Sequence, residues 1–147
     1  MTTERGILEA YAGGVISKDE IDKLSGLLAT TEELNTFVLT GKIADVSTAG
    51  SAAYAVSPVA GTLSLIYTAL EGTIATADAV LTASVDGGTN ITETITIGYD
   101  GSAAGDVDSC IPADNNTVAV GSVIKLLTNN ASTNAIAADV TFVITLT

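Results

Sequence analysis

The sequence contains no histidine, no tryptophan and a single cysteine, Cys110. Without histidine, the chain has no Ser-His or Cys-His pair for nucleophilic catalysis, and one cysteine leaves no ligand set for structural zinc. A single cysteine also excludes an intramolecular disulfide, so stability has to come from apolar burial within the chain or between copies of it. Because no base is available to activate it, we expect Cys110 to be a small buried apolar residue.

Basic residues are also scarce, with five lysines and arginines against 17 acidic residues and a net charge of -12. Such a charge argues against binding to nucleic acid and to anionic membrane surfaces, since both need clustered basic side chains. The first ten residues contain Glu4 and Glu9 and no apolar core, so they do not predict a signal peptide. Residues 46–70 are uncharged, but Gly50, Pro58 and Gly61 interrupt them, and we expect no membrane span there.

The composition of the chain changes near residue 35. Residues 1–35 hold three of the five basic residues and seven of the 17 acidic ones. From Thr36 onward, threonine, alanine, valine, isoleucine and glycine dominate. We therefore predict an N-terminal arm over residues 1–35 and a β domain over residues 36–147.

The arm contains one helix signal, a capping box formed by Ser17 and Glu20. It predicts a short helix over residues 18–29, with an apolar stripe at helical spacing. This stripe is too short to form a core alone, so it has to dock on its own β domain or on a partner. We favour a partner, because the arm differs so much in composition from the domain. The predicted partner-binding residues are Ile21, Leu24, Leu27 and Leu28.

The β domain shows alternation of apolar and hydroxyl-bearing side chains with a period of two. The clearest strand is at the C-terminus, where one face is predicted to carry Ile136, Ala138, Val140, Phe142, Ile144 and Leu146. Further strands are predicted over residues 79–85, 91–97 and 122–128, and a turn at Asp86-Gly87-Gly88 joins the first two. Another strand is predicted to bury Leu63, Leu65, Tyr67 and Ala69, and weaker candidates cover residues 36–46, 51–56 and 106–111. Glu93 falls on the apolar parity of its strand and marks an edge, or a site where that face meets water.

Seven or eight short strands separated by glycine, asparagine, aspartate and proline predict an all-β fold. The absence of an intervening helical pattern argues against a parallel α/β sheet. We expect an antiparallel β-sandwich or jelly-roll-like domain with a short N-terminal helical arm. Because its interior is rich in alanine, we also expect further apolar surface to be buried between subunits.

Two motifs carry acidic side chains in close sequence. Asp106 and Asp108 would share one face of a strand, and such a carboxylate pair could do glycosidic acid/base work. Residues 100–108 could offer oxygen ligands to calcium, although they lack the arrangement of an EF-hand loop. We favour the interpretation that these are solvated aspartates at the surface. We therefore predict no catalytic residue, no metal site and no cofactor, and expect that the protein is not an enzyme.

Four stretches resemble the β domain of tailed-phage head decoration (cement) proteins. They are GTLSLIYTALEGTIATADAVLTASVDG (61–87), TITIGYDGSAAGDVDS (94–109), NTVAVGSVIKLLT (116–128) and DVTFVITL (139–146). They include a turn at Thr76-Ala77-Asp78-Ala79 and a loop from Gly101 to Asp106.

The resemblance implies a jelly-roll-like domain that is a homotrimer on the outer surface of the capsid. It also implies that the major capsid protein is a partner, fastened by the N-terminal arm, and it carries over no catalytic residues. Two alternatives stay open on the sequence. One is a head or tail fibre or adhesin module of a virion, and the other is a carbohydrate- or calcium-binding β module.

Overall fold

The computed structural model describes residues 35–129 and 131–147, so the predicted arm helix lies outside the described residues. Residues 36–147 form one compact unit. Its regular elements in the described ranges are nine strands: β1 (Thr36–Ile43), β2 (Ala52–Val56), β3 (Gly61–Leu70), β4 (Ala79–Val85), β5 (Asn90–Ile97), β6 (Val107–Cys110), β7 (Thr117–Val118), β8 (Val123–Thr128) and β9 (Ala138–Leu146). No helix in the described part of the chain is long and apolar enough to cross a membrane.

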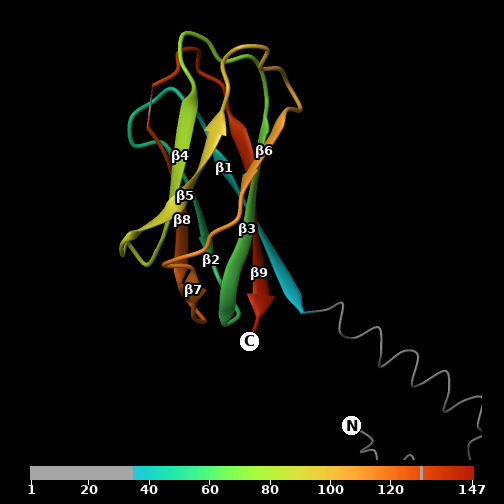
Figure 1. The fold of residues 1–147 in the computed structure, drawn as a ribbon, viewed down its shortest axis with the longest axis vertical. Coiled ribbons are helices and arrows are strands. Elements are labelled where there is room, and N and C mark those ends of the chain that lie inside the picture. Colours follow the sequence, from blue (N-terminus) through green and yellow to red (C-terminus); the bar gives the residue numbers. More distant parts are fainter. Residues whose placement is uncertain (1–34, 130) are drawn as a thin grey trace, which may run out of the picture. The chain divides into compact units, whose positions relative to one another are not determined.

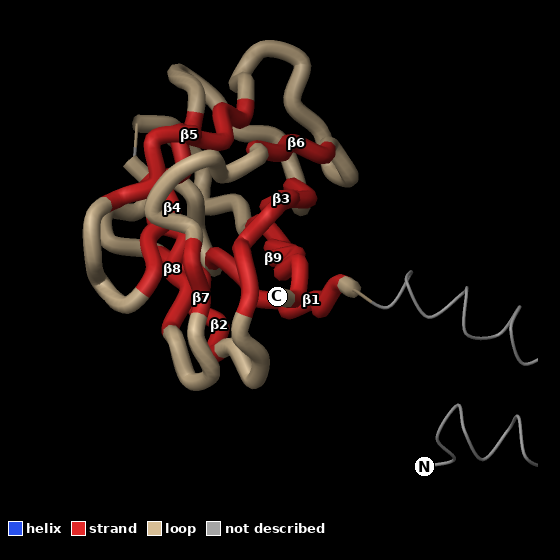
Figure 2. The backbone as a smooth tube through the Cα atoms, turned by 60° about the horizontal axis from the view of Figure 1, so that its bottom comes forward, coloured by secondary structure: helices blue, strands red, loops and turns tan. Residues whose placement is uncertain are grey.

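The strands form two antiparallel sheets that pack face to face (Figures 1 and 2). The first sheet has the order β1-β9-β3-β6, and β7 also pairs with β3. The second sheet has the order β2-β8-β4-β5. Because β6 and β7 pair with opposite ends of β3, they act as one interrupted edge strand. With that edge taken as one strand, the order is that of a jelly-roll sandwich, which confirms the all-β antiparallel prediction.

The core lies between the sheets and is built by alternate residues of each strand. On β9, Ala138, Val140, Phe142 and Ile144 are buried, as the alternation predicted. The two outermost residues of that predicted face, Ile136 and Leu146, are only partly buried. On β8, Ile124 and Leu126 are fully buried, again on the predicted face.

The burial predicted for β3 is wrong beyond Leu63. The register between β3 and β9 shifts between Leu63 and Leu65, so an extra residue reverses the face of all later side chains. As a result Ile66, Thr68 and Leu70 point inward and are buried, whereas Tyr67 is exposed. Leu65 and Ala69 are half-buried on the same outward side.

The turn between β4 and β5 matches its prediction. Asp86 and Gly87 both have positive φ angles, of 53° and 67°, as the two central residues of a type I′ turn do. The carboxylate of Asp86 also accepts hydrogen bonds from the Ser122 hydroxyl and the Val123 amide, each at 2.7 Å. The turn is thereby tied to the start of β8.

Glu93 lies on the inward parity of β5 and is half-buried. Its carboxylate accepts a hydrogen bond from the backbone amide of Ala113 at 3.0 Å. The charged residue that broke the apolar pattern thus supports the connection between β6 and β7, at the edge of the second sheet.

Candidate functional site

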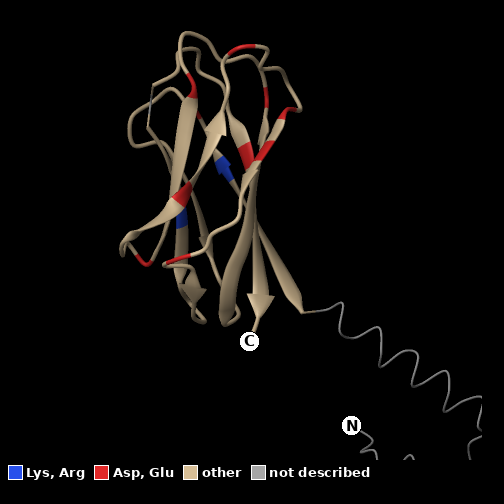
Figure 3. Ribbon diagram, in the orientation of Figure 1, with Lys and Arg blue, Asp and Glu red and all other residues tan. Residues whose placement is uncertain are grey.

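The distribution of charge separates the loops from the broad faces of the sandwich (Figure 3). We define the outer face of the first sheet by the outward residues of β1, β9, β3 and β6, which are Val38, Thr40, Lys42, Asp139, Thr141, Val143, Leu65, Tyr67, Ala69, Val107 and Ser109. Its charged residues are Lys42 and Asp139, whose charged atoms lie 3.8 Å apart, and Glu71, which directly follows β3, forms a closer ion pair with Lys42. The outward residues of the second sheet include one charge, Lys125. The other acidic residues of the β domain lie in loops or on the inward sides of β5 and β6.

Several of these acidic loop residues serve as hydrogen-bond acceptors for neighbouring segments. The pKa of Asp45 is lowered mainly by the hydroxyls of Ser47 and Thr48. The pKa of Asp86 is lowered by the Ser122 hydroxyl and then by the amide of Val123. Hydrogen bonds to the charged form of a carboxylate favour ionisation, so these aspartates stay charged and hold their loops in place.

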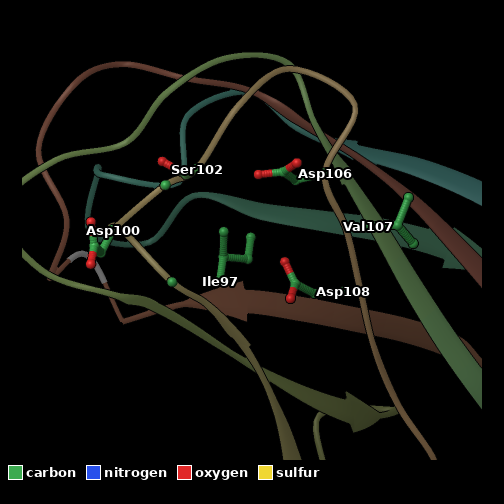
Figure 4. Close-up of a pocket in the computed structure, with 8 residues that line it drawn as sticks. Ile97, Asp100, Ser102, Asp106, Val107 and Asp108 are labelled. Atoms are coloured by element: carbon green, nitrogen blue, oxygen red, sulfur yellow. The ribbon is translucent and has the colours of Figure 1, made fainter.

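The loop between β5 and β6 borders a pocket of about 260 Å³ (Figure 4). Its lining consists of Ile97, Gly98, Asp100, Gly101, Ser102, Asp106, Val107 and Asp108. Burial raises the pKa of Asp108, and the nearby charge of Asp106 raises it further. The pocket thus offers one partly buried carboxyl group with an increased affinity for protons.

The prediction that Asp106 and Asp108 share a strand face is wrong. β6 begins at Val107, so Asp106 belongs to the preceding loop. There its carboxylate accepts a hydrogen bond from the amide of Ala103 at 2.7 Å and closes a turn. Gly101 and Gly105 supply the positive φ angles, of 80° and 90°, that this loop needs. The two carboxylates therefore do not both belong to β6, although both residues line the pocket.

Asp106 and Asp108 lie at one side of the pocket, and Asp100 lies at the opposite side (Figure 4). Within residues 35–129 and 131–147, no group of three or more acidic, cysteine or histidine side chains could hold a metal ion. The single proton of the Ser102 hydroxyl is shared between the carbonyls of Tyr99 and Ile74, at 3.1 and 3.3 Å, and its oxygen accepts from the Ile74 amide at 3.1 Å. The polar groups of this loop are thus largely committed to its own structure.

Cys110 ends β6 and faces the core, where it is 8% exposed. Burial, with a further contribution from the charge of Glu93, raises the pKa of its thiol to about 11. The thiol is therefore protonated and shielded at neutral pH, which confirms the prediction of a small buried apolar residue.

The exposed apolar side chains of the sandwich were not identified from the sequence. Those with large exposure on strands include Val38 on β1, Tyr54 and Val56 on β2, and Val107 on β6. All of them lie on edge strands, and all fall in segments that were weak strand candidates. Alternation within those segments could have identified them, because each of these residues falls on the same side of its strand as other exposed residues. The predicted partner-binding residues Ile21, Leu24, Leu27 and Leu28 lie outside the described residues.

No protein-family model matches the chain, and no curated protein matches it. Among solved structures, it resembles a chain in the acidic stable capsid structure of Helicobacter pylori bacteriophage KHP30. That match has a TM-score of 0.51 and 14% identity, and covers 76% of this chain and 87% of the phage chain.

Two further matches have lower scores. The carbohydrate-binding module CsCBM6-3 from Clostridium stercorarium, solved with cellobiose, gives a TM-score of 0.44 at 13% identity, over 76% of this chain and 82% of the module. The catalytic unit of the GH87 alpha-1,3-glucanase from Streptomyces thermodiastaticus gives 0.43 at 14% identity, over 76% of this chain but only 26% of that one. At these identities, what the chain shares with the phage protein is its fold.

Proposed function

We propose that the protein is a structural component of a phage virion, a decoration protein bound to the outer surface of the head. The observation that carries the proposal is the jelly-roll order of the two sheets, in a domain that matches most of a phage capsid chain. The sequence resemblance to head decoration proteins points to the same role. A fold alone does not determine function, so the surface of the domain has to support this role as well.

The charge of the protein supports a role on the outside of the head. A net charge of -12 would repel packaged nucleic acid, which favours a position outside the shell. Most acidic residues of the β domain lie in loops (Figure 3), and the outward residues of the two sheets include few charges. Such faces are suited to packing against other proteins, because burying unpaired charge is costly.

In this proposal the arm, residues 1–35, fastens the protein to the major capsid protein through Ile21, Leu24, Leu27 and Leu28. Several copies on one head would act together, since each additional attachment raises the overall avidity without a stronger individual contact. The β domain then presents its acidic loops to solvent and keeps crowded particles apart.

The test uses heads made without this protein, to which the purified full-length chain is added back. Cryo-electron microscopy is expected to show new density on the outer shell, and the restored heads should retain their DNA to a higher temperature. Density at the tail or inside the shell, or no binding to heads, would contradict the proposal. Density at the tail would instead support a fibre or adhesin module.

A pair of matched variants tests the arm. Leu24→Asp combined with Leu28→Asp is expected to abolish binding to heads, because two carboxylates replace two apolar side chains of the docking stripe. Val120→Asp places a charge on a residue of the β domain that is already 70% exposed, and should bind normally. Equal binding by both variants would show that the arm is not the attachment site.

A further inference from the structure

We propose that Asp100-Gly101, in the loop between β5 and β6, is a site of spontaneous isoaspartate formation in the folded protein, and that Asp86-Gly87 is protected from the same reaction. This inference does not depend on the proposed function. The sequence contains these two aspartate-glycine pairs and no others. Glycine after aspartate favours the reaction, because it has no side chain to hinder the approach of its backbone nitrogen to the neighbouring carboxyl carbon.

The reaction needs no oxidant, enzyme or cofactor. The backbone nitrogen of Gly101 attacks Cγ of Asp100, so that an N–Cγ bond forms, the Cγ–OH bond breaks, and the hydroxyl leaves as water with the proton of the nitrogen. The product is a succinimide ring. Water then opens the ring at the main-chain carbonyl carbon of Asp100 to give isoaspartate, or at Cγ to restore aspartate. Isoaspartate has the mass of aspartate, but the main chain runs through Cγ and the free carboxylate is attached to Cα.

The reacting groups of Asp100-Gly101 are available in the folded domain. Both residues are exposed, and a Cβ atom at Gly101 would meet nothing within 4 Å, as is also true at Gly87. Among the described residues, none donates a hydrogen bond to the Asp100 carboxylate, and none accepts one from the Gly101 amide. The turn is closed by a hydrogen bond from the Ser102 amide to the Tyr99 carbonyl at 3.4 Å, which is long for such a bond. The approach of the Gly101 nitrogen to Cγ therefore disrupts little of the structure.

The corresponding groups are held in place at Asp86. Its carboxylate accepts hydrogen bonds from the Ser122 hydroxyl and the Val123 amide, each at 2.7 Å. The same two bonds, the hydroxyl first, lower the pKa of Asp86, and an ionised carboxylate is a poorer electrophile than the neutral acid. The turn joins the paired strands β4 and β5 and is closed by a hydrogen bond of 2.9 Å from the Gly88 amide to the Val85 carbonyl. Reaction at Asp86 therefore requires the loss of several short hydrogen bonds.

The segments on both sides of Asp100-Gly101 are anchored to the domain, so the altered backbone should stay confined to the turn. On one side, the Tyr99 amide donates a hydrogen bond to the Asp78 carboxylate at 3.0 Å. On the other side, the Ser102 hydroxyl is hydrogen-bonded to the backbone of Ile74. The methylene that isoaspartate adds to the main chain lies between these anchors, in the lining of the pocket of about 260 Å³. The domain should therefore stay folded and accumulate the modification.

Peptide mapping of the full-length protein after prolonged incubation in its folded state tests the proposal. A protease that cleaves before aspartate but not before isoaspartate releases peptides 78–85, 86–99 and 100–105 from the denatured, unmodified chain. Isoaspartate at position 100 instead gives peptide 86–105, and isoaspartate at position 86 gives peptide 78–99. Peptide 86–105 should form at least about tenfold faster than peptide 78–99, because each hydrogen bond to a charged acceptor favours the unreactive state by roughly this factor. Electron-transfer fragmentation of peptide 86–105 should assign the isoaspartate to position 100.

The Ser122→Ala variant tests the reason for the difference. Loss of one hydrogen bond to Asp86 should raise the rate of isoaspartate formation there by about tenfold, whereas the rate at Asp100 in the same molecule is the internal control and should not change. Equal rates at the two positions of the wild type, faster reaction at Asp86, or an unchanged Asp86 rate in Ser122→Ala would overturn the proposal. So would an absence of isoaspartate at Asp100 after a free peptide of residues 97–104 has been largely converted under the same conditions. Loss of the cooperative melting transition in step with the modification would contradict its confinement to the turn.

Discussion

Replacing Phe142 by alanine is expected to remove a large part of the stability of the β domain. Phe142 is 0% exposed and lies on β9, between Leu39 of β1 and Ile66 of β3. Truncation of a buried phenylalanine costs about 3–5 kcal/mol, of which part reflects the cavity left behind. For a domain of this size, roughly 4 °C of melting temperature is lost per kcal/mol, so the midpoint should fall by about 15 °C.

Urea unfolding followed by circular dichroism measures this effect, and Tyr67→Ala provides the matched comparison. Tyr67 is also an aromatic residue in the first sheet, but it points outward and is 39% exposed. Its replacement should cost about 1 kcal/mol, since little of the core depends on it. If Phe142→Ala unfolds within about 1 kcal/mol of the wild type, or if Tyr67→Ala is the more damaging change, the assignment of inner and outer faces is wrong.

Four further predictions concern the backbone, two charged residues and the domain boundary. Gly61→Ala should prevent stable folding, because the new Cβ atom would lie 2.2 Å from the Thr145 carbonyl oxygen. Gly98→Ala is the control, because its Cβ atom would meet open space and the variant should fold normally. Soluble expression and melting curves measure both outcomes. The pKa of Asp114 is lowered by hydrogen bonds, first from the Thr92 hydroxyl and then from the Thr92 amide on β5. The ionised form of Asp114 therefore stabilises the folded state above the unfolded pKa of about 3.8, and this stability is lost as the pH falls through the lower pKa of the folded state. Asp114→Asn should therefore lower the urea midpoint at neutral pH but not well below pH 3.8. Asp108→Asn should raise the midpoint at neutral pH, because burial and Asp106 raise the pKa of Asp108 and its charge opposes folding there; a fall at neutral pH would refute this sign. A chain that begins at Thr36 should keep the β circular dichroism spectrum and a cooperative melting transition, and an unfolded fragment would show that residues 1–35 are needed for folding.

Much of the sandwich could be predicted from local patterns of the sequence. On β9 only one parity is consistently apolar, so alternation alone assigns Val140, Phe142 and Ile144 to the core. The Asp86-Gly87 turn was equally clear, since few residues accept two successive positive φ angles. In these segments the local preference and the tertiary fold agree.

β3 shows where alternation fails as a guide to burial. Both parities of its sequence contain apolar residues, so alternation cannot tell Leu65 and Tyr67 from Ile66 and Leu70. The register shift that places Ile66 inside depends on pairing with β9, which is distant in sequence. A bulge of this kind leaves no local signal in the identities of single residues.

The site residues divide in the same way. The burial of Cys110 followed from its chemistry, because a lone cysteine without an activating base is usually a core residue. The position of Asp106 did not, because a shift of one residue in the start of β6 moves it from the strand into the loop. The exposed edge of β1 required the strand order, which depends on contacts between the two ends of the domain.

The reactivity of the Cys110 thiol reports on local opening of the β domain. Cys110 is shielded at the end of β6, and β6 is held to β3 by four residue pairs. Short edge segments open at a lower free energy than the whole domain. A thiol reagent should therefore modify Cys110 at a higher rate than it would if the thiol reacted only in the globally unfolded state. The labelling rate under native conditions would then give the free energy of fraying at this edge, in an unmodified molecule.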